Sequence, residues 1–300
     1  MTTRASHAAG DAVASTSDAG VDVILATHER PHTLGYAIDA VLRQTHRRLH
    51  LHVVGDGCVP GTEEVVRSFV DPRVHFYSFP KAMGYGYVHR NHVLQRTTAP
   101  FIAYMTDDDL WFPDHLENGV RLLQEHTLDL VAFRSYHVQF PNELDPYFFA
   151  FDWRSRFATQ FLRNWFTGSV TCVHRRSVFD RVGYWNDQLF RFGDREFYNR
   201  VRVSTVPSQW VDQVTVLRFY AQHWNHRYRD LKEPPQKTWA PLVQDPAWRE
   251  RLRRQAAPGR RSLATRAHQW ADFVRFAFYS GPKFLRFWHQ RPVRAAVGEQ

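Results

Sequence analysis

The chain has 300 residues, of which 43% are apolar, and its 10 Trp, 12 Tyr and 23 Phe are enough to bury one large core or two small ones. Two cysteines, Cys58 and Cys172, exclude a disulfide framework, and no run of about 18 uncharged apolar residues predicts a transmembrane helix. The net charge is +9, and residues 225–300 carry 16 Lys and Arg against 6 Asp and Glu, which predicts an anionic partner for this quarter, such as a membrane surface, an acidic protein or nucleic acid.

Residues 1–20 are small and polar without the apolar run of a signal peptide, so we expect a disordered leader. Four buried strands are predicted from the apolar runs at 21–26, 50–54, 73–77 and 101–105. Helices are predicted between them, after Pro31, at residues 63–69 and after Gly84. Strands that alternate with helices imply βαβ units and a parallel sheet.

Polar clusters follow three of these strands, at residues 27–30, 55–57 and 107–109. In parallel sheets, ligands bind beyond the carboxyl ends of the strands. Three polar clusters at three strand ends therefore predict a binding site at that edge of the sheet.

The most informative cluster is Asp107, Asp108 and Asp109, directly after the strand at 101–105. Burial and mutual repulsion both disfavour three neighbouring ionised carboxylates, so a hard divalent cation, Mg²⁺ or Mn²⁺, is a natural companion, and it would bring substrate phosphates with it. The alternative is a polar loop with an Asp that caps a helix entered at Pro113.

The chain resembles the GT-A-fold glycosyltransferases of the large inverting family 2. The resemblance is carried by the order and spacing of six segments, at residues 26–31, 53–58, 86–91, 106–113, 182–187 and 192–200. It implies an α/β fold with a Rossmann-like, mostly parallel sheet, a nucleotide-sugar donor and a divalent metal.

The resemblance also implies roles for residues that bind the donor. The first loop, with Thr27, His28 and Arg30, would hold the nucleotide, and Asp56 would contact the pyrimidine base. Gly55 stands where relatives carry the first member of an Asp pair, and the alternative for Asp56 is an ordinary turn residue.

Arg90 follows Gly86 at the entrance of a helix, where it would meet the pyrophosphate. The alternative is a solvated arginine on a surface helix. Alignment on Pro113 places Asp107 toward the ribose and makes Asp108 the main metal ligand. Asp109 would either support these ligands without touching the metal or be an additional ligand, and a plain Asp-x-Asp interpretation would use Asp107 and Asp109 instead.

Two residues of the second half have roles by the same resemblance. Asp194 is the candidate general base, which takes the proton from the acceptor hydroxyl. The alternative is that it caps the helix predicted over 196–203. His223 would reach the diphosphate or the metal, or it is one ordinary histidine of 17.

The chain is divided into a leader at 1–20, a glycosyltransferase domain at 21–225 and a basic, aromatic-rich helical extension at 226–300. Residues after Pro235 are expected to form a linker into this extension. From 260 to 294, bulky apolar and basic residues alternate, which is typical of interfacial helices on anionic lipid, or of an appendage that packs its aromatics on the domain.

The predicted function is inverting transfer of a sugar, of hexosyl type, from a UDP- or dTDP-sugar to an acceptor hydroxyl of a polysaccharide, glycolipid or metabolite. The enzyme would be cytoplasmic, with the extension at the inner face of the membrane, and nucleic acid is not expected as its partner. The rival hypothesis is a non-catalytic binding or scaffold protein with a membrane- or nucleic-acid-binding tail. A sugar nucleotidylyltransferase is disfavoured because no long glycine-rich phosphate loop occurs near the N-terminus.

Overall fold

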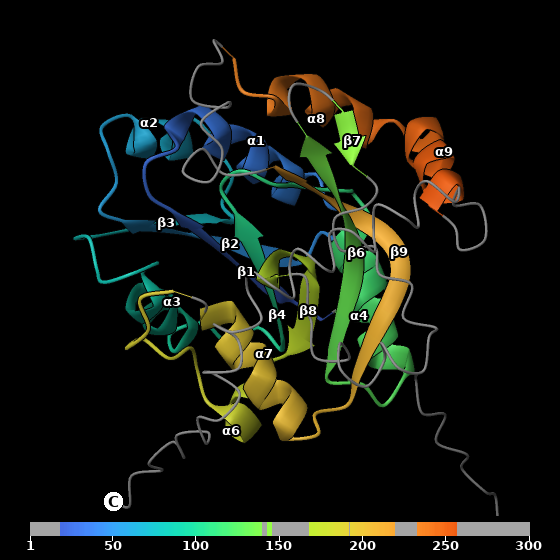
Figure 1. Ribbon diagram of the computed structural model, residues 1–300. Helices are drawn as coiled ribbons and strands as arrows, with labels where there is room; N and C mark the ends of the chain where they lie inside the picture. The colour runs from blue at the N-terminus through green and yellow to red at the C-terminus, as the bar shows by residue number, and fades with distance from the viewer. Residues whose placement is uncertain (1–18, 140–142, 146–167, 192, 220–232, 257–300) are drawn as a thin grey trace, which may run out of the picture.

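The computed structural model describes residues 19–139, 143–145, 168–191, 193–219 and 233–256 (Figure 1). Along the chain these residues form β1 (Val21–Thr27), α1 (Pro31–Leu42), β2 (Leu49–Asp56), α2 (Thr62–Arg67), β3 (Val74–Phe79), α3 (Tyr87–Leu94), β4 (Phe101–Thr106), β5 (Leu110–Trp111), α4 (His115–Glu125), β6 (Leu130–Gln139), β7 (Glu143–Asp145), the 3₁₀ helix η1 (Ser169–Thr171), β8 (Cys172–Arg175), α6 (Val178–Val182), α7 (Gly193–Val203), β9 (Ser208–Phe219), α8 (Gln236–Gln244) and α9 (Pro246–Ala256).

All described strands join one sheet, in the order β3-β2-β1-β4-β8-β6-β9-β5, with β7 paired to β6. The strands β3, β2, β1 and β4 are parallel, as the alternating pattern of their sequence predicts. The other half is mixed: β8 is antiparallel to both β4 and β6, and β9 is parallel to β6. The α/β fold is therefore confirmed, with a parallel half that carries the predicted strand ends.

The register of the parallel half brings those ends together. Thr27 at the end of β1 pairs with Gly55 of β2, and its neighbour Ala26 pairs with Thr106 of β4. The three polar clusters of the sequence therefore share one edge of the sheet, at the carboxyl ends of its central strands.

Two buried clusters cover the two faces of the sheet. On one face, alternate residues of β1, such as Val23 and Leu25, pack with α1 and α4. On the other, Ile24 packs with residues of α3, α6 and α7. This alternation follows from the period of two along a strand and makes a three-layer arrangement, in which each fully buried aliphatic side chain contributes roughly 1.5–3 kcal/mol.

The residues after Pro235 form helices rather than the expected linker. Trp239 and Val243 of α8 and Leu252 of α9 are buried in the same core cluster as α1, and Figure 1 shows the two helices lying against the same side of the sheet. Proline at a helix N-terminus is compatible with helix formation, which the linker interpretation overlooked. The rest of the predicted extension, residues 257–300, lies outside the described residues. Within them, no helix is both long and apolar enough to cross a membrane.

We expect Trp239→Ala to lower the free energy of unfolding by about 3 kcal/mol or more, because it empties a buried site between α8, α9 and the main core. Val70→Ala, at a side chain that is 99% exposed, is the matched control and should have almost no effect. Chemical denaturation measures both. If the two variants were equally stable, α8 would not be part of the folded domain.

Candidate functional site

The acidic triplet forms the short connection between β4 and β5. Because β5 pairs with the end of β9, the connection is covered, and Asp107, Asp108 and Asp109 are all buried. The helix expected from Pro113 begins at His115, and its N-cap residue Asp114 makes no side-chain capping bond. The capping alternative is therefore not what the structure shows, and the buried carboxylates need other partners.

Asp107 and Asp108 share one partner from the loop after β1. The Nη1 atom of Arg30 donates to Asp107 Oδ1 at 2.8 Å and to Asp108 Oδ2 at 3.0 Å. Thr27 Oγ1 donates to the other oxygen of Asp107 at 2.9 Å. Arg30 is held at this place because Pro31 starts α1 directly behind it. The structure thus brings together four of the residues predicted to bind the donor and the metal.

Asp109 is held by the end of β9 instead. Its Oδ1 accepts the backbone N–H of Phe219 at 2.9 Å, and its Oδ2 accepts the Thr106 hydroxyl at 2.6 Å and lies 3.4 Å from Arg218 Nε. Both carboxylate oxygens thus already accept hydrogen bonds within the protein. A role for Asp109 as an additional metal ligand stays a prediction.

Burial dominates the electrostatics of the triplet. It raises the pKa of Asp108 to about 8, with Asp109 and Asp107 pushing in the same direction and Arg30 opposing them. The pKa of Asp109 is also raised by burial, against Arg218 and its hydrogen bonds. The nearby carboxylates in turn raise the pKa of Arg30, despite its desolvation, so this guanidinium stays charged. Among the described residues, the three carboxylates have only two arginines beside them, and burial favours the protonated form of Asp108 over a third negative charge.

The chemistry of this donor set fits a magnesium or manganese ion. Among the described residues no three His, Cys, Asp or Glu side chains are grouped to hold a metal. Mg²⁺, however, is usually bound by one or two carboxylates together with substrate phosphates and water. Asp107 and Asp108 already converge on one cationic atom, and both offer hard oxygen ligands. His223, the other predicted ligand, lies outside the described residues.

Asp56, the predicted base-binding residue, forms a second centre at the end of β2. Its carboxylate accepts Lys81 Nζ at 2.6 Å and the backbone N–H of Ala82 at 2.7 Å, and His89 Nε2 lies 3.4 Å away. A glycine rather than an aspartate at position 55 has a steric reason, since a Cβ there would lie 2.7 Å from Cys58 Sγ. Asp56 is therefore more than an ordinary turn residue.

His28 joins the first two loops. Its Nδ1 donates to the Gly57 carbonyl oxygen at 3.0 Å, which ties the loop after β1 to the loop after β2. His28 follows Thr27 and Gly57 follows Asp56 in sequence, so this hydrogen bond joins the two loops that carry these site residues.

Asp194 lies in the first turn of α7, which packs against α3. The hydroxyl of Tyr87 in α3 accepts the backbone N–H of Gly193 at 3.0 Å. A Cβ at Gly193 would lie 2.4 Å from Tyr87 Cζ, so the tyrosine ring leaves no room for a side chain at this position. The guanidinium of Arg90, also in α3, lies 5.2 Å from the centroid of the Tyr87 ring and donates a hydrogen bond to the carbonyl oxygen of Tyr85 at 3.2 Å.

Several residues of the site were not anticipated from the sequence. Arg218 and Gln236 reach the triplet from far along the chain; Gln236 Nε2 donates to the Asp108 carbonyl oxygen at 2.6 Å and is itself buried. Lys81 neutralises Asp56, and Tyr87 supports the start of α7. The contact of Lys81 with Asp56 could have been anticipated, because Lys81 is a basic residue in the loop before the helix that follows Gly84. No sequence pattern points to Gln236.

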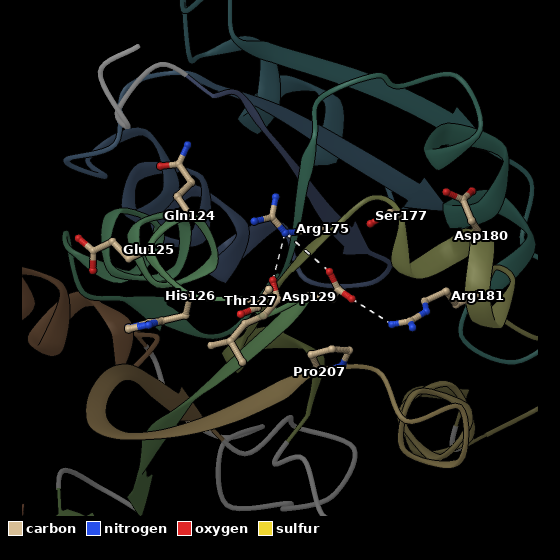
Figure 2. Close-up of a pocket in the computed structure, with 11 residues that line it drawn as sticks. Gln124, Glu125, His126, Thr127, Asp129, Arg175, Ser177, Asp180, Arg181 and Pro207 are labelled. Atoms are coloured by element: carbon tan, nitrogen blue, oxygen red, sulfur yellow. Dashed lines mark hydrogen bonds and ion pairs between the residues drawn. The ribbon is translucent and has the colours of Figure 1, made fainter. Parts of the chain in front are cut away.

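A polar groove of about 810 Å³ lies at the opposite edge of the sheet, at the amino ends of the parallel strands (Figure 2). Its two arginines converge on Asp129: Arg181 Nη1 lies 3.1 Å from one carboxylate oxygen and Arg175 Nε 3.7 Å from the other. Arg175 also donates to the Leu123 and Leu128 carbonyl oxygens after α4. Arg175 and Asp129 therefore connect the end of α4 with the start of β6.

Comparisons with known proteins agree with this arrangement. A model of the family described as glycosyl transferase family 2 matches residues 22–186. The Escherichia coli protein UDP-Glc:alpha-D-GlcNAc-diphosphoundecaprenol beta-1,3-glucosyltransferase WfgD is 27% identical over 37% of this chain and 44% of its own length. Protein CgeD of Bacillus subtilis is 25% identical over 60% of this chain and 46% of its own length. The chain thus spans less than half of each of these relatives.

Two solved structures share the fold. TarS of S. aureus in complex with UDP-GlcNAc superposes with a TM-score of 0.56 at 15% identity, over 67% of this chain and 59% of that one. The mannosyltransferase PcManGT of Pyrobaculum calidifontis, in complex with GDP-Man and Mn²⁺, superposes with a TM-score of 0.52 at 18% identity, over 89% and 83% of the two chains.

We expect Asp108→Asn to stabilise the metal-free protein increasingly as the pH rises from about 4 to about 8. The pKa of Asp108 is about 8 in the fold and near 3.9 when unfolded, so in this window the folded protein holds a proton that the unfolded chain releases, and stability falls as the pH rises. Asparagine does not titrate, so its advantage should grow by about 1 kcal/mol per pH unit at most.

Urea denaturation at pH 5, 6.5 and 8, without divalent ions, measures this difference. The exposed Asp180→Asn is the control and should follow the wild type at every pH. A constant offset between Asp108→Asn and the wild type would contradict the raised pKa.

Proposed function

The chain belongs to glycosyl transferase family 2, and on that premise we propose that it transfers a sugar from a UDP- or dTDP-sugar to an acceptor hydroxyl, with inversion at the anomeric carbon. The observation that carries the proposal is the group at the ends of β1 and β4, where Arg30 joins Asp107 and Asp108. It lies beyond the carboxyl ends of parallel strands, where α/β proteins bind nucleotides.

The donor is proposed to lie across the two centres at this edge. Thr27, His28 and Arg30 would face the nucleoside, with Asp107 toward the ribose and Asp56 toward the base. Arg90, at the start of α3, would approach the diphosphate, helped by the positive end of that helix. The solved complexes of TarS with UDP-GlcNAc and of PcManGT with GDP-Man support a nucleotide-sugar donor through the shared fold alone.

Asp108 is proposed as the main ligand of Mg²⁺ or Mn²⁺, with Asp107 beside it and with Asp109 and His223 as further candidates. The ion, when bound, supplies positive charge to the diphosphate leaving group. Support comes from the presence, in the described part of the chain, of only two arginines beside three buried carboxylates and from the convergence of two of these carboxylates on Arg30. The guanidinium of Arg30 would stay charged beside these carboxylates, because it cannot lose its proton.

Asp194 is proposed as the general base. It would take the proton of the acceptor hydroxyl while that oxygen forms a bond to the anomeric carbon on the face opposite the diphosphate. The bond between the anomeric carbon and the diphosphate oxygen breaks, and its electron pair leaves with the nucleoside diphosphate. The place of Asp194 in the first turn of α7, braced by Tyr87, supports a fixed position for this carboxylate.

The acceptor is proposed to be a hydroxyl of a polysaccharide, a glycolipid or a metabolite. Most of residues 135–170, where we expected acceptor selection, lie outside the described residues, as do residues 260–294, the proposed contact with an anionic membrane surface. That contact would hold the enzyme at the cytoplasmic face of the membrane. The proposal rests on the charge and aromatic content of the sequence there.

We expect Asp194→Asn to lower turnover by roughly 10²–10⁴-fold, the usual contribution of a positioned base, while donor affinity hardly changes. Hydrolysis of UDP-glucose and other UDP-sugars with Mn²⁺ measures turnover without knowledge of the acceptor. Asp187→Asn, in the exposed loop before α7, is the matched control.

The alternative role for Asp194 gives a different result. If Asp194 only caps α7, the variant would lose stability and keep its activity per folded molecule. A protein that binds no sugar nucleotide at all and turns over none would support the non-catalytic scaffold instead.

A further inference from the structure

Large apolar side chains gather on one part of the surface. The described residues expose six of them by more than a third, and four belong to two segments: Met83 (54%), Tyr85 (38%) and Val88 (42%) around the start of α3, and Phe190 (60%) before α7. Val70 and Val203 are exposed singly elsewhere, which is ordinary for a protein surface. A cluster of this kind is not ordinary and marks an interaction site.

The backbones of the two segments are in direct contact, so the four exposed side chains stand on adjoining stretches of chain, which we call the α3 patch (Met83, Tyr85, Val88 and Phe190). A Cβ at Gly84 would lie 2.4 Å from the carbonyl oxygen of Phe190 and 2.9 Å from that of Leu189, which shows how closely the backbones approach. Figure 1 shows the loop before α3 and the loop before α7 side by side.

Cationic side chains border the α3 patch. The guanidinium of Arg191 lies 5.5 Å from the centroid of the Phe190 ring, and Arg90 donates to the carbonyl oxygen of Tyr85. Lys81 precedes the first segment and is paired with Asp56. The loop before α7 also carries Asp187, which is half-buried. Exposed apolar and aromatic side chains with arginines beside them are the composition of interfacial membrane contacts.

The shape of the α3 patch favours a broad partner over a small ligand. Small molecules bind in concave pockets that cover most of their surface, whereas these side chains stand on two loops and the outer side of a helix and are largely uncovered. A bilayer offers an apolar interior below an anionic face, and this matches apolar side chains bordered by the exposed Arg191.

We propose that the α3 patch docks onto the surface of an anionic lipid bilayer. Tyr87 lies between Tyr85 and Val88 in sequence, and its hydroxyl accepts the N–H of Gly193, so docking would set the start of α7 and Asp194 beside the membrane. What docking serves, the presentation of a membrane-held acceptor to Asp194, rests on the proposed function. The docking itself does not depend on it, nor on the tail at 260–294.

Co-sedimentation of the full chain with vesicles of phosphatidylcholine and phosphatidylglycerol in a 3:1 ratio tests the proposal. We expect the double variant M83S/F190S to partition at least tenfold more weakly than the wild type. The control V70S/V203S removes the same kind of exposed apolar surface elsewhere and should bind as the wild type does. The difference should persist in 0.5 M salt, because salt screens the basic tail but not apolar insertion.

Equal partitioning of M83S/F190S and the wild type at both salt concentrations would overturn the proposal. Sedimentation velocity without lipid identifies the competing occupant: a wild-type dimer that M83S/F190S disperses, with vesicle binding unchanged, would make the patch an interface between two copies. UDP-sugar hydrolysis without lipid should be the same in all three proteins. It reports on the proposed function separately, so docking can fail while transfer activity stands.

Discussion

The structure is organised around the burial of three consecutive carboxylates at the end of a central strand. Each would be costly alone, and together they repel. The protein meets this cost with partners from distant parts of the chain: Arg30 and Thr27 after β1, Arg218 and Phe219 at the end of β9, and Gln236 at the start of α8. The compensation is incomplete, because the pKa of Asp108 stays well above its ordinary value. A site that buries three carboxylates beside only two arginines of the residues that the structure describes is suited to a divalent cation and its anionic ligand, because the cation would stabilise the ionised carboxylates.

Helix α3 links the two ends of the proposed active site. At its start, His89 and the preceding Lys81 contact Asp56, the proposed base-binding residue. On its other side, Tyr87 braces the backbone at Gly193, and Asn91 makes two hydrogen bonds with the backbone of Trp185. The helix therefore fixes the spacing between the place proposed for the nucleotide and the place proposed for the acceptor. The α3 patch extends the same helix to the surface.

The sequence predicted the parallel half of the fold well, because each of its strands is a short apolar run and three of the four runs end in polar residues. For the same reason Thr27, Arg30, Asp107 and Asp108 could be expected at one edge, since parallel strand ends must meet there. The contacts of Arg218 and Gln236 could not be predicted, because they depend on how β9 and α8 return to the triplet more than 100 residues later. The helices after Pro235 were mistaken for a linker, although proline also starts helices. The crowding at Gly193 comes from Tyr87 and that at Gly55 comes in part from Phe76 and Tyr77, so both depend on contacts that form only when the chain folds.

The central claim is that the triplet and Arg30 form a divalent-dependent site for a nucleoside diphosphate. Calorimetric titration of UDP and of dTDP, with and without Mn²⁺, into the wild type and Asp108→Asn tests it most directly. The account predicts binding to the wild type that requires Mn²⁺, and loss of that binding in a variant that remains folded. Equal affinity in the two proteins, or wild-type binding that is the same without Mn²⁺, would contradict it.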